Sequence, residues 1–60
     1  MWALFRVVSN QIMADAWKEL LEAEGIPTQV VPEAPNLTAA RRIYIPDVKV
    51  RVVEEILRKI

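Results

Sequence analysis

Few side chains in this 60-residue chain are suited to catalysis or metal binding. The chain has no histidine and no cysteine, so it lacks the most common general base, the thiolate nucleophile and the soft metal ligands. Three carboxylates, Asp15, Glu19 and Glu22, share a helical face at a spacing that could hold a cation or exchange a proton. Such a pattern is usually a solvated helix face. We therefore predict a protein that is not an enzyme, with no catalytic residue, metal site or cofactor.

Arg41 and Arg42, close to Tyr44, form the most distinctive polar cluster. Arg42 and Tyr44 would share one face of a strand, as the stacking residues of RNA-recognition modules do. The two arginines could instead bind a small anion or nucleotide together with Asn36 of the preceding loop. Packing of amphipathic side chains at an interface or in solvent is the third interpretation. The last is favoured over RNA, because eight basic and eight acidic residues give no net charge to attract nucleic acid.

The composition favours a single domain, residues 1–60, that associates with itself. A domain of this length buries only about 60% of the surface of its unfolded chain. Yet 53% of the residues are hydrophobic, and without cysteine no disulfide can stabilise the fold. No apolar run approaches the roughly 18 residues of a membrane span, and the start of the chain does not read as a signal peptide. We expect a homo-oligomer, dimer or larger, located in the cytoplasm and not in a membrane.

The first two elements are predicted to be a strand and a helix. Residues 3–9, "ALFRVVS", are rich in β-branched and aromatic types. Alternation puts Phe5 and Val7 on one face of this strand and Leu4, Arg6 and Val8 on the other. Ser9 or Asn10 then caps a helix that starts at Gln11. The centre of its apolar arc, near Met13 and Leu20, should enter the core, with Trp17 and Leu21 at one margin.

The segment "LLEAEGIP" predicts an abrupt end to that helix. Gly25 can adopt the left-handed conformation without a Cβ clash, Ile26 can fold back on the last turn, and Pro27 prevents the helix from continuing. Residues 28–31, "TQVV", then form a second strand. A strand, a helix and a strand in succession favour two parallel strands joined by a right-handed crossover.

The remaining segments predict a loop, a strand and a helix. Residues 32–40 contain two prolines and read as an exposed loop. A third strand follows at 41–45, with Ile43 and Ile45 inward, and Pro46 ends it. Residues 48–60 contain alternating valines, as in a strand, but their apolar residues also form one helical stripe. We predict a helix there.

The order β-α-β-β-α predicts an α+β fold of ferredoxin-like type without the final strand. The three-stranded sheet has the order 2-3-1, with two helices on one face. The other face and the free edge of the first strand are then available to a partner. The predicted interface residues are Trp2, Leu4, Val8, Trp17, Leu21 and Tyr44, and the predicted structural residues are Gly25, Pro27 and Pro46.

The segments "LLEAEGIP" and "IYIP", with a closing amphipathic helix, resemble a known family. This family groups small prokaryotic signal-transducing proteins of unknown function that are compared with PII-like proteins on grounds of fold. The resemblance implies a regulatory role. Three functions therefore stay open: a non-enzymatic regulatory or protein-interaction module, which is favoured, a small-ligand sensor using residues 32–42, and an RNA-binding module.

Overall fold

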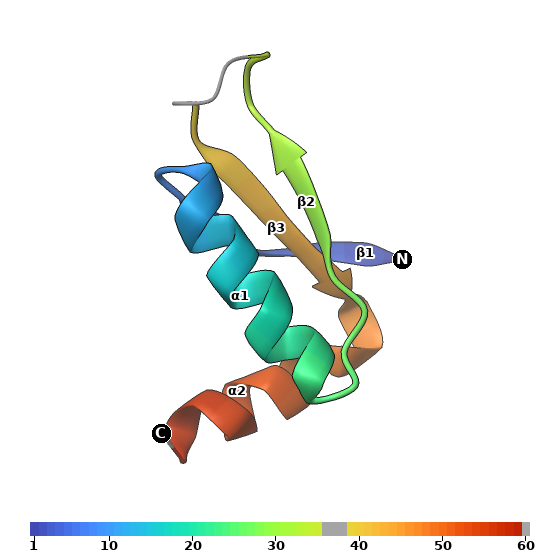
Figure 1. Ribbon diagram of the computed structural model, residues 1–60. Coiled ribbons are helices and arrows are strands. Elements are labelled where there is room, and N and C mark those ends of the chain that lie inside the picture. Colours follow the sequence, from blue (N-terminus) through green and yellow to red (C-terminus); the bar gives the residue numbers. More distant parts are fainter. Residues whose placement is uncertain (36–38, 60) are drawn as a thin grey trace.

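The computed structural model describes residues 1–35 and 39–59. Within them the chain forms an α+β fold with a three-stranded antiparallel sheet and two helices (Figure 1). The strands are β1 (Trp2–Val8), β2 (Gln29–Pro32) and β3 (Arg41–Pro46), in the order β1-β3-β2. Because β1 and β2 both run antiparallel to β3, they are parallel to each other. The predicted strand order and the position of β3 between the other strands are confirmed.

A β-bulge in β1 reverses the faces predicted for the end of that strand. Leu4 lies opposite Tyr44, but Arg6 and not Phe5 lies opposite Ile43, so the register shifts by one residue. Phe5 and Arg6 both contact Trp17 on the helix side of the sheet. The side chains that follow therefore exchange faces.

Val7 and Val8 show the result of this exchange. Val8 was expected on the uncovered face but is buried in the core, with 4% of its surface exposed, whereas Val7 is 48% exposed. The prediction for these two residues is wrong, because simple alternation does not allow for the extra residue in the strand.

Helix α1 (Gln11–Ala23) is capped by Asn10, one of the two residues predicted for this role. The side-chain oxygen Oδ1 of Asn10 accepts a hydrogen bond of 2.9 Å from the backbone N–H of Met13. The hydroxyl of Ser9 instead donates a hydrogen bond of 3.4 Å to the side-chain sulfur of Met13. The two candidates are thus distinguished by geometry.

Replacing Asn10 by alanine should lower the free energy of unfolding by about 1 kcal/mol, because the start of α1 loses its capping hydrogen bond. Ser9→Ala is the matched control, and it should change stability by less than about 0.5 kcal/mol. Urea unfolding followed by circular dichroism measures both. Equal effects of the two substitutions would show that Asn10 is not the cap.

The end of α1 has the geometry predicted from Gly25. Gly25 has φ +79°, its N–H donates to the carbonyl of Glu22, and the N–H of Ile26 donates to the carbonyl of Leu21, both at 3.0 Å. These two bonds form a Schellman motif. Leu21 and Ile26 are both buried, so the motif joins the helix end directly to the core.

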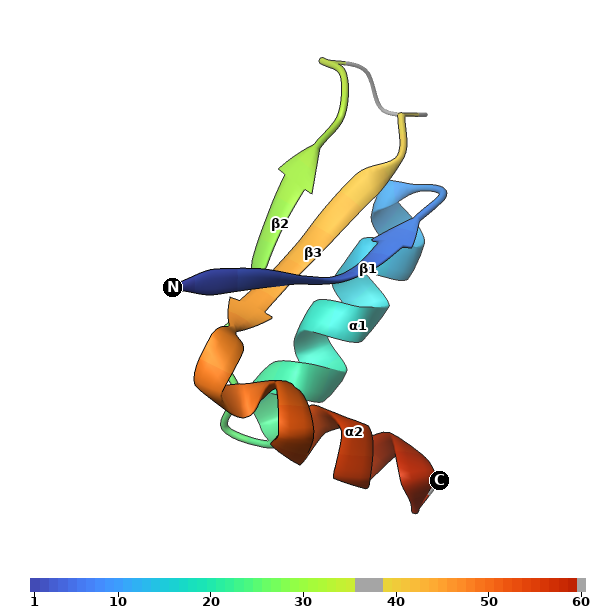
Figure 2. The same ribbon diagram turned by 180° about the vertical axis from the view of Figure 1, so that it is seen from behind.

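The last segment is helical, as predicted, but it starts with a tighter turn. A 3-10 turn, η1 (Asp47–Lys49), follows Pro46 and leads into α2 (Val50–Arg58). Ile60 lies outside the described residues. α1 covers one face of the sheet, whereas α2 lies across the end of α1 and not alongside it (Figures 1 and 2). The expectation of two helices on one sheet face is therefore met only in part.

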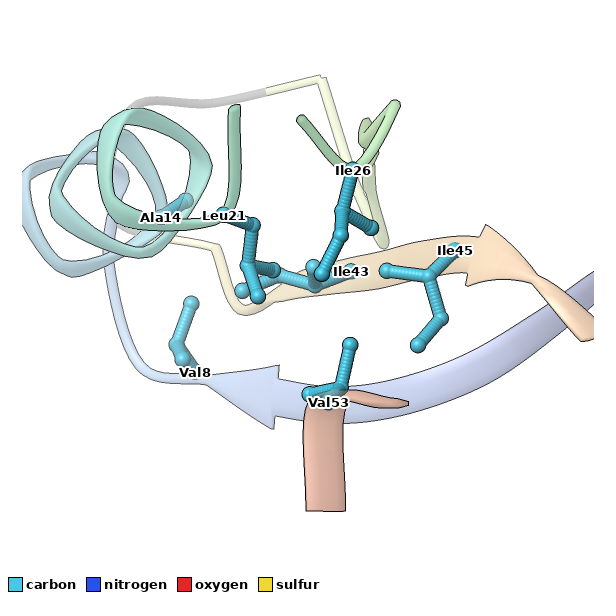
Figure 3. Close-up of a cluster of buried hydrophobic side chains, with 7 residues drawn as sticks. All are labelled: Val8, Ala14, Leu21, Ile26, Ile43, Ile45 and Val53. Carbon is cyan, nitrogen blue, oxygen red and sulfur yellow. The ribbon is translucent and has the colours of Figure 1, made fainter. Parts of the chain in front are cut away.

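The core is formed where all these elements meet (Figure 3). Its buried hydrophobic residues are Val8, Ala14, Leu21, Ile26, Ile43, Ile45 and Val53. The predicted inward direction of Ile43 and Ile45 is confirmed, since neither is exposed. Met13 and Leu20, in contrast, are 45% and 39% exposed. The prediction that they enter the core is wrong, because the residues of α1 that face the sheet are Leu21 and the small Ala14.

Candidate interaction surfaces

The helical carboxylates do not converge on a common site. Asp15 accepts a hydrogen bond of 2.6 Å at Oδ1 from the amide of Gln11, while Glu19 and Glu22 are exposed. Among residues 1–35 and 39–59, there is no group of three or more Asp, Glu, His or Cys side chains that could hold a metal ion.

Arg41 and Arg42 lie on opposite faces of β3. Arg41 is 4% exposed. Its Nε donates to Oε1 of Gln11 at 2.8 Å, and its Nη1 donates to the backbone carbonyl of Ala39 at 2.5 Å. This guanidinium therefore ties the start of β3 to the start of α1. The burial of Arg41 could have been predicted from strand alternation, because Arg41 is two residues from the inward Ile43.

Arg42 points to the uncovered side and pairs with Glu33. Its Nε lies 3.1 Å from Oε1 of Glu33 in an exposed ion pair. Hydrogen bonding to Glu33, and then to Tyr44, raises the pKa of Arg42 above its ordinary value. The arginine stays protonated near neutral pH in any case. The two arginines therefore do not form one anion site, and Asn36, the third predicted ligand residue, lies outside the described residues.

The face of the sheet opposite α1 carries a group of neighbouring apolar side chains. The strand register places Leu4 beside Tyr44, and it places Val7 and Val31 on either side of Arg42. Trp2 lies opposite Pro46 at the same face. We call these residues the sheet surface: Trp2, Leu4, Val7, Val31, Arg42, Tyr44 and Pro46.

Neither helix shields the sheet surface from solvent. Trp2, Leu4, Val7 and Val31 are 43–53% exposed. Seen from behind, the strands lie in front of α1 with no helix over them (Figure 2). Of the six predicted interface residues, the structure brings Trp2, Leu4 and Tyr44 together here and places Val8 in the core. Val31 lies here too, as alternation along its strand predicts, whereas Val7 joins this surface only because of the bulge in β1.

A second apolar surface lies on α1. Met13, Ala16, Trp17 and Leu20 line a hollow of about 180 Å³. We call these four residues the α1 groove. They have the i, i+3, i+4, i+7 spacing of one helical stripe. Leu21, which sequence reasoning placed at the margin of this stripe, is instead 1% exposed and faces the core.

Trp17 is held in place at one side of the α1 groove. Its ring packs edge to face on Phe5 with centroids 5.3 Å apart. The guanidinium carbon of Arg6 lies 4.5 Å from the centroid of Trp17 and 5.2 Å from that of Phe5. Such cation–π contacts favour a fixed ring orientation. The bulge that brings Phe5 and Arg6 to the same side is therefore the feature that positions Trp17.

A polar cleft of about 430 Å³ lies between α1 and β2. Its lining includes Gln11, Asp15 and Lys18 from the helix and residues 28–32 from the strand side. The side chain of Gln11 already bonds Asp15 and Arg41, and Oγ1 of Thr28 donates to the carbonyl of Ile26 at 3.1 Å. Several polar side chains that line the cleft are therefore already hydrogen-bonded within the protein.

Comparisons with models of protein families, with curated proteins and with solved structures give no match for this chain. In the part that the structure describes, α1 has 13 residues and α2 has nine, and neither is a candidate membrane span.

Proposed function

We propose that this chain is a small regulatory or protein-interaction module that forms a homo-oligomer through the sheet surface. One observation carries the proposal: Leu4, Val7 and Val31 are exposed on one sheet face, around Arg42 and Tyr44 of the central strand. Contiguous exposed apolar patches on small proteins mark sites of association. The chain takes a ferredoxin-like arrangement that lacks the last strand, and the observed strand order is compatible with it.

A protein surface fits the sheet surface better than RNA does. Among the residues that the structure describes, Arg42 is the one cationic strand residue on the face opposite α1, and it is paired with Glu33. RNA binding depends on cations that are free to meet phosphates. The regulatory role belongs to the same proposal and rests on the resemblance carried by "LLEAEGIP" and "IYIP". The cytoplasmic location is also part of the proposal, and it rests on the lack of an apolar run of membrane-span length in the sequence.

Sedimentation of the parent, Val7→Lys and Val48→Lys tests the proposal. Val48 is 79% exposed in the turn η1 and is not one of the residues of the sheet surface, so it controls for placing lysine at an exposed valine. The parent should sediment above the 6.9 kDa of one chain at micromolar concentration. Val7→Lys should weaken association at least tenfold, because a lysine in an interface core must be desolvated. Val48→Lys should behave as the parent does.

Circular dichroism of each variant shows whether it is folded, so loss of association can be told from unfolding. A parent that stays a folded single chain at micromolar concentration contradicts the proposal. So does a folded Val7→Lys that associates as strongly as the parent.

A further inference from the structure

The geometry points to a second and separate binding surface: the α1 groove is a docking site for an amphipathic helix of a partner protein with basic residues along its flank. Met13 and Leu20 are 45% and 39% exposed although they stand at the centre of the apolar arc of α1. With Ala16 and Trp17 they form one stripe along α1 at the i, i+3, i+4 and i+7 spacing, against which a second helix can pack. The inference does not depend on the sheet surface.

The shape of the groove suits a helix. The small Ala16 lies beside the larger Met13, Trp17 and Leu20, so the stripe is hollowed at Ala16 with bulky residues around it. The hollow that results is almost wholly apolar in its lining residues. A leucine or phenylalanine of a partner helix can sit over Ala16 as a knob between these neighbours.

The chain's own second helix leaves the groove open. α2 lies across the end of α1 and sends Val53 into the core (Figures 1 and 3). A second helix packed alongside α1 would cover the groove. The structure thus leaves this face of α1 without a covering helix.

The charges around the groove select the partner. Glu19 and Glu24 are exposed near the groove, and Glu22 is exposed further round the helix. No salt bridge to any of the three is found within residues 1–35 and 39–59. One cation, Arg6, borders the groove at the Trp17 side, where it lies over the rings of Phe5 and Trp17. A lysine or arginine on the partner helix complements these carboxylates, whereas an acidic helix would be repelled.

Nuclear magnetic resonance of the full chain tests this inference with two synthetic probes. One is an 18-residue amphipathic helix with leucine on one face and lysine on the other, and the second has glutamate in place of lysine. The indole N–H signal of Trp17 reports on the groove, and that of Trp2 reports on the opposite face of the sheet. We expect the lysine peptide to move the Trp17 signal and leave the Trp2 signal in place. The glutamate peptide should bind about tenfold more weakly.

Two variants make the test specific. Leu20→Lys should abolish the shift of the Trp17 signal. Glu19→Lys, at an exposed position outside the core, should reduce the preference for the lysine peptide severalfold even if Leu20→Lys fails to fold. The inference is overturned if the lysine peptide moves Trp2 and not Trp17, or if both peptides bind equally. It is also overturned if Leu20→Lys disrupts the oligomer, because the groove would then be filled by a second copy of the chain.

Discussion

Val8→Lys should unfold the protein, whereas the same substitution at the neighbouring Val7 should leave it folded. Val8 is 4% exposed and packs in the core, so a lysine there must bury its ammonium group. The cost of an unpaired buried charge is on the order of several kcal/mol. A domain of this size rarely has more than about 5 kcal/mol of stability in total. Val7 is 48% exposed on the sheet surface, where a lysine can reach water.

Thermal unfolding followed by circular dichroism distinguishes the two variants. Val8→Lys should show no cooperative transition at 25 °C or above, while Val7→Lys should keep one. This contrast tests the β-bulge itself, since an unbroken alternation along β1 would bury Val7 in place of Val8. A folded Val8→Lys together with an unfolded Val7→Lys would mean that the bulge is absent.

Gly25→Val should destabilise the chain by about 1–2 kcal/mol or more. Gly25 has φ +79°, a backbone conformation that a β-branched residue adopts only with strain. A Cβ at this position would meet no atom within 4 Å, so the cost comes from the backbone and not from crowding. The hydrogen bonds from Gly25 and Ile26 to the last turn of α1 depend on that conformation.

Gly25→Asn is the matched control, because asparagine tolerates the left-handed conformation far better than valine does. Urea unfolding should therefore rank the parent first, then Gly25→Asn, and Gly25→Val last. A valine variant that melts within a degree or two of the parent would show that the end of α1 does not need this conformation in solution.

Several features of the fold could be predicted because they depend on neighbours in the chain. The helix ends near Gly25 because glycine and Pro27 act within a few residues. Ile43 and Ile45 point inward because alternation is regular in β3, which has no bulge. The strand order follows from the sequence of elements and the parallel crossover between β1 and β2.

The candidate surfaces could be predicted only in part. Trp2, Leu4 and Tyr44 were expected on the uncovered face and lie there, since the alternation holds up to Leu4. Val8 and Leu21 were placed at an interface and are in the core. Arg41 and Arg42 were grouped by their closeness in sequence, although adjacent residues of a strand point to opposite faces.

What the sequence determined by itself was the set of strands and helices, their order and their approximate ends, because these follow from backbone preferences and capping within a few residues. Only the tertiary structure decided which apolar side chains are buried. The apolar arc of α1 is wider than the contact that a three-stranded sheet offers, so packing had to select part of it. The small Ala14 allows close approach, and this places Leu21 inside and leaves Met13 and Leu20 outside. The bulge in β1 likewise arises from pairing with β3 and not from any local signal, and it decides that Val7 faces outward and that Phe5 and Arg6 meet Trp17.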